Sequence, residues 1–341
     1  MTQSKTIFKG AFYLTITNIF AQLLSLFVNI ILGRLLIPSD FGVVALSTTF
    51  IGSITIFTSV GFGAAIIHFQ KATHDEISTL YWINWILSIF TYLIIYISAA
   101  FSADFFSTPD LKNIVRISAL SILLTPFYII HYKQLERDLK FKLLSKISFI
   151  STFTGSIASI IGAFSGLGAY SLCLQPITSS FTLLIIVNWK SKWHPKFIFK
   201  LHEVKKMLWY SVKFKASNSF TFIERNIDYL ILGKIYPSNV LGHYSFSYNI
   251  MYAPVKRISY LFNDVLFPSF SSYQNNKEKI TQAYFKSTQL IALVSFPLMT
   301  LLGLNAELII QLVFGDKWLE AIPIIKILCF AGAVQSIAQV G

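Results

Sequence analysis

Long apolar stretches alternate along the chain with short segments that carry most of the charges. A helix needs about 20 apolar residues to cross the roughly 30 Å hydrocarbon core of a bilayer. Ten stretches predict such helices, over residues 10–35, 41–69, 80–103, 114–132, 146–165, 168–189, 207–234, 240–263, 285–305 and 320–341. The segment from Ile147 to Trp189 carries no charge and is too long for one helix. We therefore predict a helical hairpin whose turn is Ser165-Gly166-Leu167-Gly168.

The composition excludes an ordinary soluble protein. Of the 341 residues, 54% are hydrophobic and 13% are charged, and the mean hydropathy is +0.62. In water a chain of this size would expose a largely apolar surface, whereas a bilayer accepts such a surface without penalty. The predicted fold class is therefore all-α, in the form of a polytopic membrane protein.

The distribution of basic residues indicates the orientation of the chain. Loops on the side of the N-terminus carry most of them, within the segments 133–146, 190–215 and 256–286. The opposite side carries Arg34, Lys112, Arg116, Lys234 and Lys317. Because cytoplasmic loops are enriched in lysine and arginine, the N-terminus is predicted to be cytoplasmic. This bias also accounts for the net charge of +13 without a nucleic-acid partner.

A sequence repeat suggests how the helices are grouped. Residues 32–42 (LGRLLIPSDFG) and 232–242 (LGKIYPSNVLG) match at an offset of 200, so the first predicted helix corresponds to the seventh. A match between odd-numbered helices predicts a parallel repeat, as in transporters built from two rocking halves. The alternative explanation is that leucine, glycine and proline recur at many helix corners.

The repeat predicts two helical bundles around a central cavity. Residues 1–189 form an N-terminal lobe of six helices, residues 190–206 a basic, hinge-like cytoplasmic linker, and residues 207–341 a C-terminal lobe of four helices. We expect the second lobe to be incomplete, with about ten helices present of twelve or more in two such lobes. Either the chain is a fragment or the natural product is truncated.

Polar residues inside two predicted spans follow helical spacing. In the first helix, Asn18, Gln22, Ser25 and Asn29 lie on one face. The corresponding stripe of the seventh helix comprises Ser211, Lys215, Asn218, Phe222, Arg225 and Tyr229. Such stripes either line a polar cavity or make hydrogen bonds between helices, each worth about 0.6 to 2 kcal/mol.

Charges make the seventh helix the stronger candidate for a cavity. Its span contains Lys213, Lys215, Glu224, Arg225 and Asp228, and each charge at the bilayer centre costs about 2.5 to 3.5 kcal/mol on insertion scales. Alternatively, the two lysines extend to the interface, and Arg225 pairs with Asp228 one turn away. Glu224 fits either explanation.

The eighth helix carries Lys256 and Arg257 after Pro254, near the predicted inner interface. These two residues are a solvated flank of the helix, or a kink at the proline turns them into the cavity.

Signals for catalysis or metal binding are poor. The six histidines are scattered, no metal-ligand spacing occurs, and the sequence has no nucleophile elbow or phosphate loop. Gly61-Phe62-Gly63 is interpreted as close packing of helices. Cys173 and Cys329 both lie in apolar runs, so no disulfide framework is predicted. We predict that the protein is not an enzyme and has no cofactor and no bound metal.

Taken together, these landmarks resemble the polysaccharide-repeat flippases, of the O-antigen and colanic-acid exporter type, within the multidrug, oligosaccharidyl-lipid and polysaccharide exporter superfamily. The resemblance rests on Leu32-Gly33-Arg34, Pro38-Ser39-Asp40-Phe41-Gly42, Gly61-Phe62-Gly63, Arg225, Asp228-Tyr229, Leu232-Gly233-Lys234, Leu241-Gly242-His243-Tyr244-Ser245, Leu266-Phe267-Pro268-Ser269-Phe270-Ser271 and the segment from Trp318 to Ile325. It covers nearly the whole chain. This chain departs from the family in length, because members of the family usually have at least twelve helices and this chain supplies about ten.

The resemblance implies a multi-pass protein of the bacterial inner membrane. Such a protein translocates oligosaccharide repeat units on undecaprenyl pyrophosphate, for O-antigen, capsule or exopolysaccharide biosynthesis, by alternating access between two lobes. Implied partners are this lipid-linked substrate, membrane lipids and other polysaccharide-assembly proteins. The predicted substrate-binding residues are Arg225, Asn218, Asn18, Gln22, Asn29, Lys215 and Arg257, with Glu224 and Asp228 as coupling or structural charge partners. Arg225 is the first choice for the pyrophosphate, because a guanidinium forms paired hydrogen bonds to phosphate.

Two other functions compete with this interpretation. A drug or small-molecule antiporter of the same superfamily would favour acidic cavity residues that bind cations, whereas this sequence places cations there. An integral-membrane polysaccharide polymerase or glycosyltransferase would normally carry a large outer loop with paired carboxylates. Asp40, in a short loop, is a poor substitute for such a pair.

Overall fold

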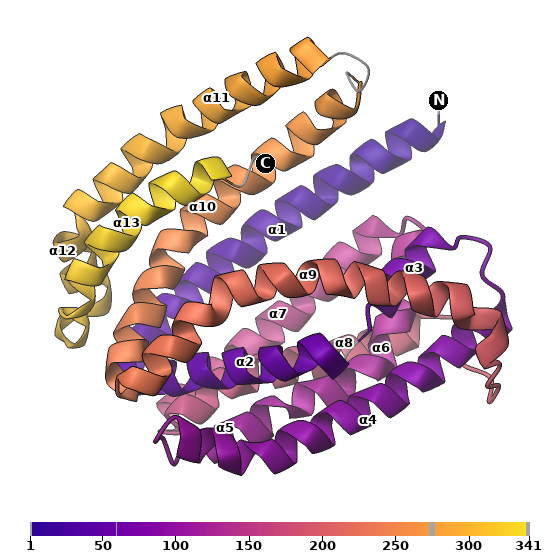
Figure 1. Ribbon diagram of the computed structural model, residues 1–341, viewed down its shortest axis with the longest axis horizontal. Helices are drawn as coiled ribbons and strands as arrows, with labels where there is room; N and C mark the ends of the chain where they lie inside the picture. The colour runs from indigo at the N-terminus through magenta and orange to yellow at the C-terminus, as the bar shows by residue number, and fades with distance from the viewer. Residues whose placement is uncertain (1, 59, 273–276, 339–341) are drawn as a thin grey trace. The chain divides into compact units, whose positions relative to one another are not determined.

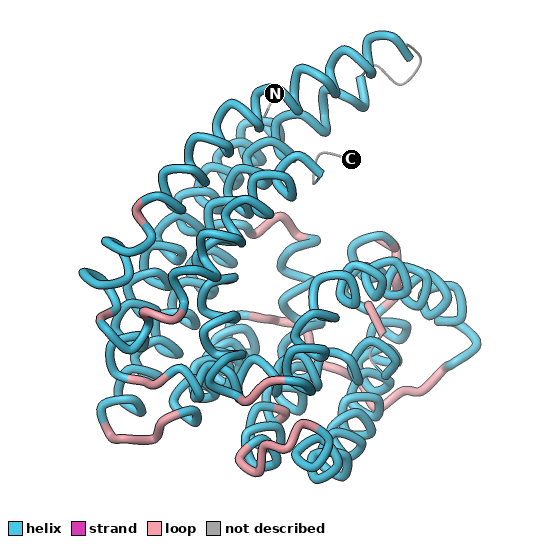
Figure 2. Tube along the Cα trace, turned by 60° about the vertical axis from the view of Figure 1, so that its left-hand side comes forward, coloured by secondary structure: helices cyan, strands magenta, loops and turns pink. Residues whose placement is uncertain are grey.

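A computed structural model describes residues 2–58, 60–272 and 277–338, with side chains at all of these positions except 2–16, 18, 217–218 and 257–277. Within these ranges every element is a helix and the connections are loops, with no strand (Figure 2). The prediction of an all-α fold is therefore confirmed. In lipid this is the expected outcome, because a helix satisfies its backbone hydrogen bonds within one segment.

The described helices follow one another along the chain with short connections (Figure 1). Their bounds are α1 Thr2–Leu35, α2 Pro38–Thr58, α3 Phe62–His68, α4 His74–Phe105, α5 Leu111–Ser118, α6 Leu120–Arg137, α7 Phe141–Phe164, α8 Ala169–Lys190, α9 Leu201–Ile235, α10 Ser238–Ser272, α11 Lys277–Leu304, α12 Ala306–Ile309 and α13 Ala321–Ala338. A π-helical turn at Ile310–Phe314 and a 3₁₀ turn at Asp316–Trp318 join α12 to α13.

Seven helical segments in the described part of the chain are long and apolar enough to cross a membrane. They are Pro38–Thr58, His74–Phe105, Leu111–Arg137, Phe141–Phe164, Ala169–Lys190, Glu278–Leu304 and Ala321–Ala338. The protein is thus a multi-pass membrane protein. The other predicted spans lie on α1, α9 and α10, which are outside this set. The count of about ten spans therefore stays a prediction.

The prediction of one helix over residues 41–69 is wrong. The structure has two helices there, with α2 ending at Thr58 and α3 beginning at Phe62. The backbone of Gly61 leaves the helical region, with φ −77° and ψ 51°. Two glycines within three residues, Gly61 and Gly63, lower the helix propensity here, because each costs about 1 kcal/mol relative to alanine.

The predicted hairpin turn between α7 and α8 is confirmed. Gly166 and Gly168 have φ values of +77° and +52°, in the left-handed region that glycine adopts without steric penalty. The Leu167 N–H donates to the Gly162 carbonyl and the Gly166 N–H donates to the Ala163 carbonyl, both at 3.1 Å. This pair of hydrogen bonds is the Schellman motif, which satisfies the last carbonyls of a helix.

The two copies of the sequence repeat have the same local structure. In the first copy α1 ends at Leu35 and α2 begins at Pro38, and in the second α9 ends at Ile235 and α10 begins at Ser238. The corresponding N–H groups close each first helix in the same way, with donation from residue 36 to the residue 32 carbonyl and from residue 236 to the residue 232 carbonyl, both at 2.8 Å. This likeness of the two corners agrees with a repeat, and the parallel-repeat arrangement of the helices stays a prediction.

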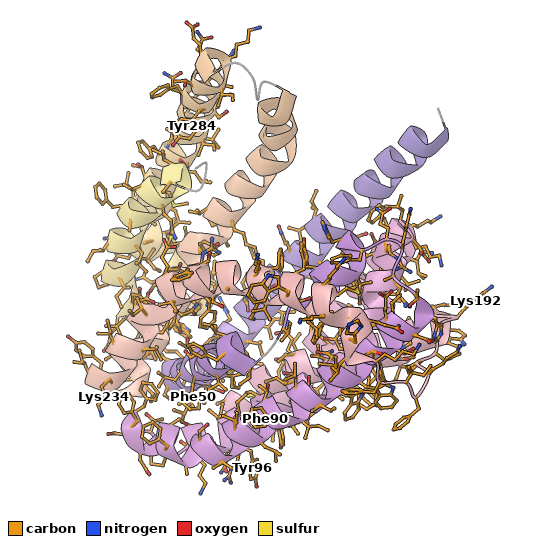
Figure 3. The ribbon with its side chains drawn as sticks, turned by 45° about the vertical axis from the view of Figure 1, so that its right-hand side comes forward. Phe50, Phe90, Tyr96, Lys192, Lys234 and Tyr284 are labelled. Carbon is orange, nitrogen blue, oxygen red and sulfur yellow. The ribbon has the colours of Figure 1, made fainter. Side chains whose placement is uncertain are left out.

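The chain packs as two compact units. The first comprises Met1–Leu36 and Val43–Ser238, and the second comprises Ile37–Gly42 and Asn239–Gly341. In the first unit α1 packs along α7, α7 along α8, and α9 against α3 and α4, while in the second α11 packs along α13. Lys192, just after α8, and Lys234, in the last turn of α9, lie at opposite ends of the first unit (Figure 3). The predicted lobes, 1–189 and 207–341 with the linker 190–206, stay a prediction.

An aromatic cluster forms the core of the second unit at the start of α10. Trp318 is fully buried and its ring stacks on Phe246, with ring centroids 3.7 Å apart. Phe41 and Phe314 complete the cluster with edge contacts, Phe41 to Trp318 at 5.2 Å and Phe314 to Phe246 at 4.7 Å. The first turn of α2 and α10 meet closely here, because a Cβ at Gly242 would overlap the Pro38 carbonyl oxygen.

We expect Gly242→Ala to lower the thermal stability of the protein, because the added methyl group meets a backbone carbonyl that cannot rotate away. Overpacking of this kind typically costs about 1–3 kcal/mol. The midpoint of thermal unfolding in detergent measures the effect. Gly303→Ala is the control, since the nearest atom to its Cβ would be Cys329 Cβ at an ordinary 3.5 Å. Equal midpoints for both variants would contradict the close approach of α2 and α10.

Candidate functional site

One face of α9 packs against α2 and α3 in the first unit. Ser211 and Tyr229 are buried on this face. Phe222, which lies between them at helical spacing, contacts α2 where a Cβ added at Gly52 would overlap its ring. The predicted polar stripe of the seventh helix therefore coincides, at these three positions, with the face of α9 that packs against neighbouring helices.

The glycines that begin α3 permit a close approach on the same side. A Cβ at Gly61 would lie 3.3 Å from Phe214 Cδ1 and 3.4 Å from the Ser211 carbonyl oxygen, and one at Gly63 would lie 3.1 Å from Lys133 Cγ. Most Cβ contacts are looser than these. The close packing predicted for Gly61-Phe62-Gly63 is therefore confirmed.

The charged residues of the stripe differ in their exposure. Lys215 and Asp228 are half-buried, whereas Glu224 and Arg225 are exposed. Arg225 and Asp228 both have interaction partners, and the Tyr229 N–H donates to Asp228 Oδ1 at 2.9 Å. The face thus combines a packed centre with a guanidinium that remains accessible.

The predicted amides of α1 lie on a helix with other packing partners. Gln22 and Asn29 are exposed and Ser25 is half-buried, on a helix that packs along α7, whereas α9 packs on α3 and α4. The side chains of Asn18 and of Asn218 in α9 lie outside the described residues. A joint role of the two stripes in one cavity therefore stays a prediction.

Arg257 belongs to α10, and its side chain is outside the described residues. Its neighbour Lys256 is exposed and Pro254 is half-buried. Because α10 lies in the second unit and α9 in the first, the predicted joint action of Arg257 and Arg225 also stays a prediction.

The connector between α8 and α9 is hydrogen-bonded to the start of α4. The Lys196 N–H donates to Ser78 Oγ and the Lys200 N–H donates to Thr79 Oγ1, both at 3.1 Å. The Trp82 Nε1–H donates to the Lys196 carbonyl at 2.8 Å. Side chains on successive turns of α4 therefore hold the backbone of a segment that its composition predicts as a hinge.

A cluster of aromatic rings and histidines joins the connector to α4 and α6. The Trp193 ring lies 5.0 Å from His131, 5.5 Å from His74 and 6.0 Å from Tyr81, measured between centroids. His131 is buried, and its Nδ1 lies 3.0 Å from Ser191 Oγ. The sequence does not reveal this cluster, because its members come from two helices and a loop and form no motif. Among the described residues no group of three or more His, Cys, Asp or Glu side chains could hold a metal ion.

Ion pairs complete the attachment at the end of the connector. Lys200 Nζ lies 3.1 Å from Asp75 Oδ2 of α4 and 3.1 Å from Glu203 Oε1 of α9. The hydrogen bond to Asp75, followed by that to Glu203, raises the pKa of Lys200 above its ordinary value. Lys200 therefore stays protonated and joins the first turns of the two helices.

The helices and the charged face of α9 define a class: an all-helical, multi-pass membrane protein that carries ionisable residues along one of its long helices. Such residues are rare in membranes and usually mark a pathway for substrate or ions. Residues 31–323 match the Polysaccharide biosynthesis protein family, and the chain belongs to that family.

Curated relatives agree with this assignment. The chain is 31% identical over 282 residues to the teichuronic acid biosynthesis protein TuaB of Bacillus subtilis, covering 82% of this chain and 58% of TuaB. It is 29% identical over 313 residues to a membrane protein of the cps region of Klebsiella pneumoniae, covering 91% of this chain and 64% of that protein. The lipopolysaccharide biosynthesis protein WzxC of Escherichia coli is 25% identical over 339 residues, with 99% of this chain and 69% of WzxC covered. The predicted resemblance to polysaccharide-repeat flippases is confirmed, and the chain spans less than two thirds of the length of the first two relatives.

Solved structures identify the fold. The lipid II flippase MurJ, in an inward closed conformation, superposes with a TM-score of 0.73 at 15% identity over 96% of this chain and 74% of MurJ. An inward-facing multidrug transporter of the MATE family, in the MOP superfamily, superposes with a TM-score of 0.61 at 16% identity over 94% of this chain and 81% of that one. The described helices thus share the fold of these transporters.

We expect Thr79→Val to destabilise the protein by about 1–3 kcal/mol, the usual cost of leaving a buried hydrogen-bonding group without its partner. Valine has a similar shape but cannot accept the Lys200 N–H hydrogen bond. Thr91→Val on the same helix is the control, because the buried Thr91 hydroxyl bonds only to the Leu87 carbonyl of its own helix among the described contacts. A lower midpoint of thermal unfolding for Thr79→Val than for Thr91→Val is expected. Equal midpoints would show that the connector is not held by this bond.

Proposed function

We propose that this protein translocates undecaprenyl-pyrophosphate-linked oligosaccharide repeat units across the bacterial inner membrane by alternating access. The observation that carries the proposal is α9, which packs against apolar helices and yet carries Lys215, Arg225 and Asp228 away from both of its ends. Membership of the polysaccharide biosynthesis family and the fold of a lipid II flippase support a carrier of lipid-linked sugars. The proposed activity is therefore transport and not catalysis.

The energetics of charge in a membrane support a polar substrate path along α9. Each central charge costs about 2.5 to 3.5 kcal/mol on insertion scales, and a water-filled path between the lobes offsets that cost. In this path Arg225 and Lys215 pair with the pyrophosphate, while the amides Asn18, Gln22, Asn29 and Asn218 bond to sugar hydroxyls. Arg257 joins them from α10, and the lipid tail stays in the bilayer.

The proposed path lies between two lobes of parallel-repeat helices, residues 1–189 and 207–341, joined by the linker 190–206. The identical helix corners at residues 32–38 and 232–238 support this grouping. Two such lobes have twelve or more helices, of which about ten lie in this chain. Glu224 and Asp228 serve as coupling or structural partners of the cations, and other polysaccharide-assembly proteins are the proposed partners.

We expect substitutions of Arg225 to separate substrate binding from structure. Arg225→Lys retains a positive charge but loses the paired hydrogen bonds to phosphate, so it should keep partial polysaccharide export. Arg225→Gln removes both and should reduce export at least about tenfold, since a hydrogen bond to a charged group contributes about 1.5–3 kcal/mol. The measurement is surface polysaccharide, together with the lipid-linked oligosaccharide that accumulates in the cytoplasmic leaflet, at equal amounts of membrane protein.

Two variants control this experiment. Arg116→Gln removes an arginine whose guanidinium lies over the Tyr96 ring at 4.1 Å, outside the stripe, and should leave export unchanged. The double variant Arg225→Gln with Asp228→Asn removes both members of the alternative structural pair. Full export by the double variant would end the substrate-binding role of Arg225, because only a broken pair leaves an uncompensated charge. Lengthening of sugar chains by the purified protein would instead indicate an enzyme.

The proposed orientation places the N-terminus and the connector after α8 in the cytoplasm. We expect cysteines at Lys192, in the connector before α9, and at Tyr236, directly after α9, to react with impermeant thiol reagents from opposite sides, since both positions are exposed. The background carries serine at Cys173 and Cys329. Position 236 should label in intact cells and position 192 only after the membrane is opened. Labelling of both positions in intact cells would contradict the positive-inside assignment.

A further inference from the structure

The segment that leaves α8 and enters α9 presents exposed aromatic rings among exposed lysines. We name this surface the connector platform. Its members are Trp189, Lys192, Lys196, Phe197, Phe199, Lys205, Lys206 and Trp209. All belong to the first unit, and Lys192 extends from its end (Figure 3). Neither the packing of α9 nor the proposed substrate path uses these side chains.

Hydrogen bonds from α4 hold the backbone on both sides of the phenylalanines, and the Phe197 ring also lies edge-on to Trp82, with ring centroids 5.0 Å apart. The backbone is held at Lys196 by Ser78 and Trp82, and at Lys200 by Thr79. Phe197, between these anchors, is 92% exposed and Phe199 is 53% exposed. A loop free to rearrange would cover such rings, because each buries a large apolar area favourably. The fold instead keeps the two phenylalanine rings exposed. This exposure indicates that another apolar surface contacts the rings.

The platform lies at the level where spanning helices end. The apolar span of α8 ends at Lys190 and that of α4 begins at His74, and the connector is bonded to the first turns of α4. Tryptophan and lysine concentrate at this boundary between hydrocarbon and headgroups, where a ring is apolar at one end and polar at the other. The surface against the exposed rings is therefore the bilayer interface.

The charge of the platform selects the kind of lipid. Residues 189–213 contain seven lysines and one acidic residue, Glu203. Glu203 is already paired with Lys200. Lys192, Lys196, Lys205 and Lys206 are exposed. Juxtamembrane lysines attract acidic lipids, with about 1 kcal/mol for each lysine near the surface.

We infer that the connector platform binds the headgroups of acidic phospholipids such as phosphatidylglycerol. The lysines pair with the phosphodiesters, and Trp189, Phe197 and Phe199 enter the boundary between headgroups and acyl chains. This attachment fixes the connector to the membrane on one side while α4 holds it on the other. The inference does not depend on the proposed substrate, and its test measures lipid binding without transport.

The test compares binding of phosphatidylglycerol and phosphatidylcholine to the purified protein in detergent, by native mass spectrometry of an equimolar mixture. The test variant carries Lys192→Gln, Lys196→Gln, Lys205→Gln and Lys206→Gln. We expect the ratio of the two binding constants to fall at least about tenfold in this variant, and to recover when the same four positions carry arginine. Phe197→Ser with Phe199→Ser should weaken binding of both lipids, because the rings contact acyl chains rather than headgroup charge.

The matched control removes the same charge from other exposed lysines, with Lys71→Gln, Lys140→Gln, Lys142→Gln and Lys146→Gln. It should keep most of the preference for phosphatidylglycerol. A control that loses the preference as fully as the test variant would overturn the inference, because net charge alone would then attract the lipid. An unchanged ratio in the test variant would overturn it as well. If the glutamine variant fails to fold, the double phenylalanine variant decides, because unchanged binding of both lipids in that variant would overturn the inference. Binding of an acidic protein to the platform, with no preference between the two lipids, would also overturn the inference, because the platform would then serve a protein partner.

Discussion

A bilayer offers no hydrogen bonds to a polypeptide, and this absence is the constraint on which the rest of the structure depends. Every backbone group that crosses the hydrocarbon must be satisfied within its own segment, so the described part of the chain is built from helices. Because lipid tails are as apolar as the side chains, the hydrophobic effect contributes little to pairing these helices. The pairing of the helices therefore depends on close packing and on hydrogen bonds between them. Gly52 beneath Phe222, Gly155 beneath Ser179 and Gly242 beneath the Pro38 carbonyl are among the places where a missing side chain permits that approach.

The lack of polar groups in the bilayer also makes the charges of α9 notable, because a charge in a membrane needs a partner or water. Its polar face combines packing positions such as Ser211 and Tyr229 with the exposed Arg225, so the same helix that packs in the first unit is the one proposed to border a polar path. A purely structural helix would not need an accessible guanidinium, and a purely solvated one would not bury Tyr229. Under the proposed function these charges serve the movement of anionic, sugar-bearing lipids, a proposal that family membership and the shared fold support.

Sequence reasoning identified the helical positions well and their partners poorly. The spacing of Ser211, Phe222 and Tyr229 indicates one face of a helix, but not that this face meets α2 and α3. The cluster of Trp193 with His74 and His131 was missed altogether, since these residues are separated by more than a hundred positions at the extremes. The break between α2 and α3 was also missed, although two nearby glycines were visible, because apolar continuity is a stronger signal than glycine content in a membrane span.

What the sequence alone determined is what depends on local chemistry. Hydropathy sets where the apolar helices run, the glycine pattern sets the hairpin turn at residues 165–168, and the two similar eleven-residue segments set two similar helix corners. What only the tertiary structure decided is which faces meet. The connector after α8 has the composition of a free hinge, yet Ser78, Thr79 and Trp82 of α4 hold it. Such contacts join residues more than a hundred positions apart, and their energy comes from geometry that appears only when the helices pack.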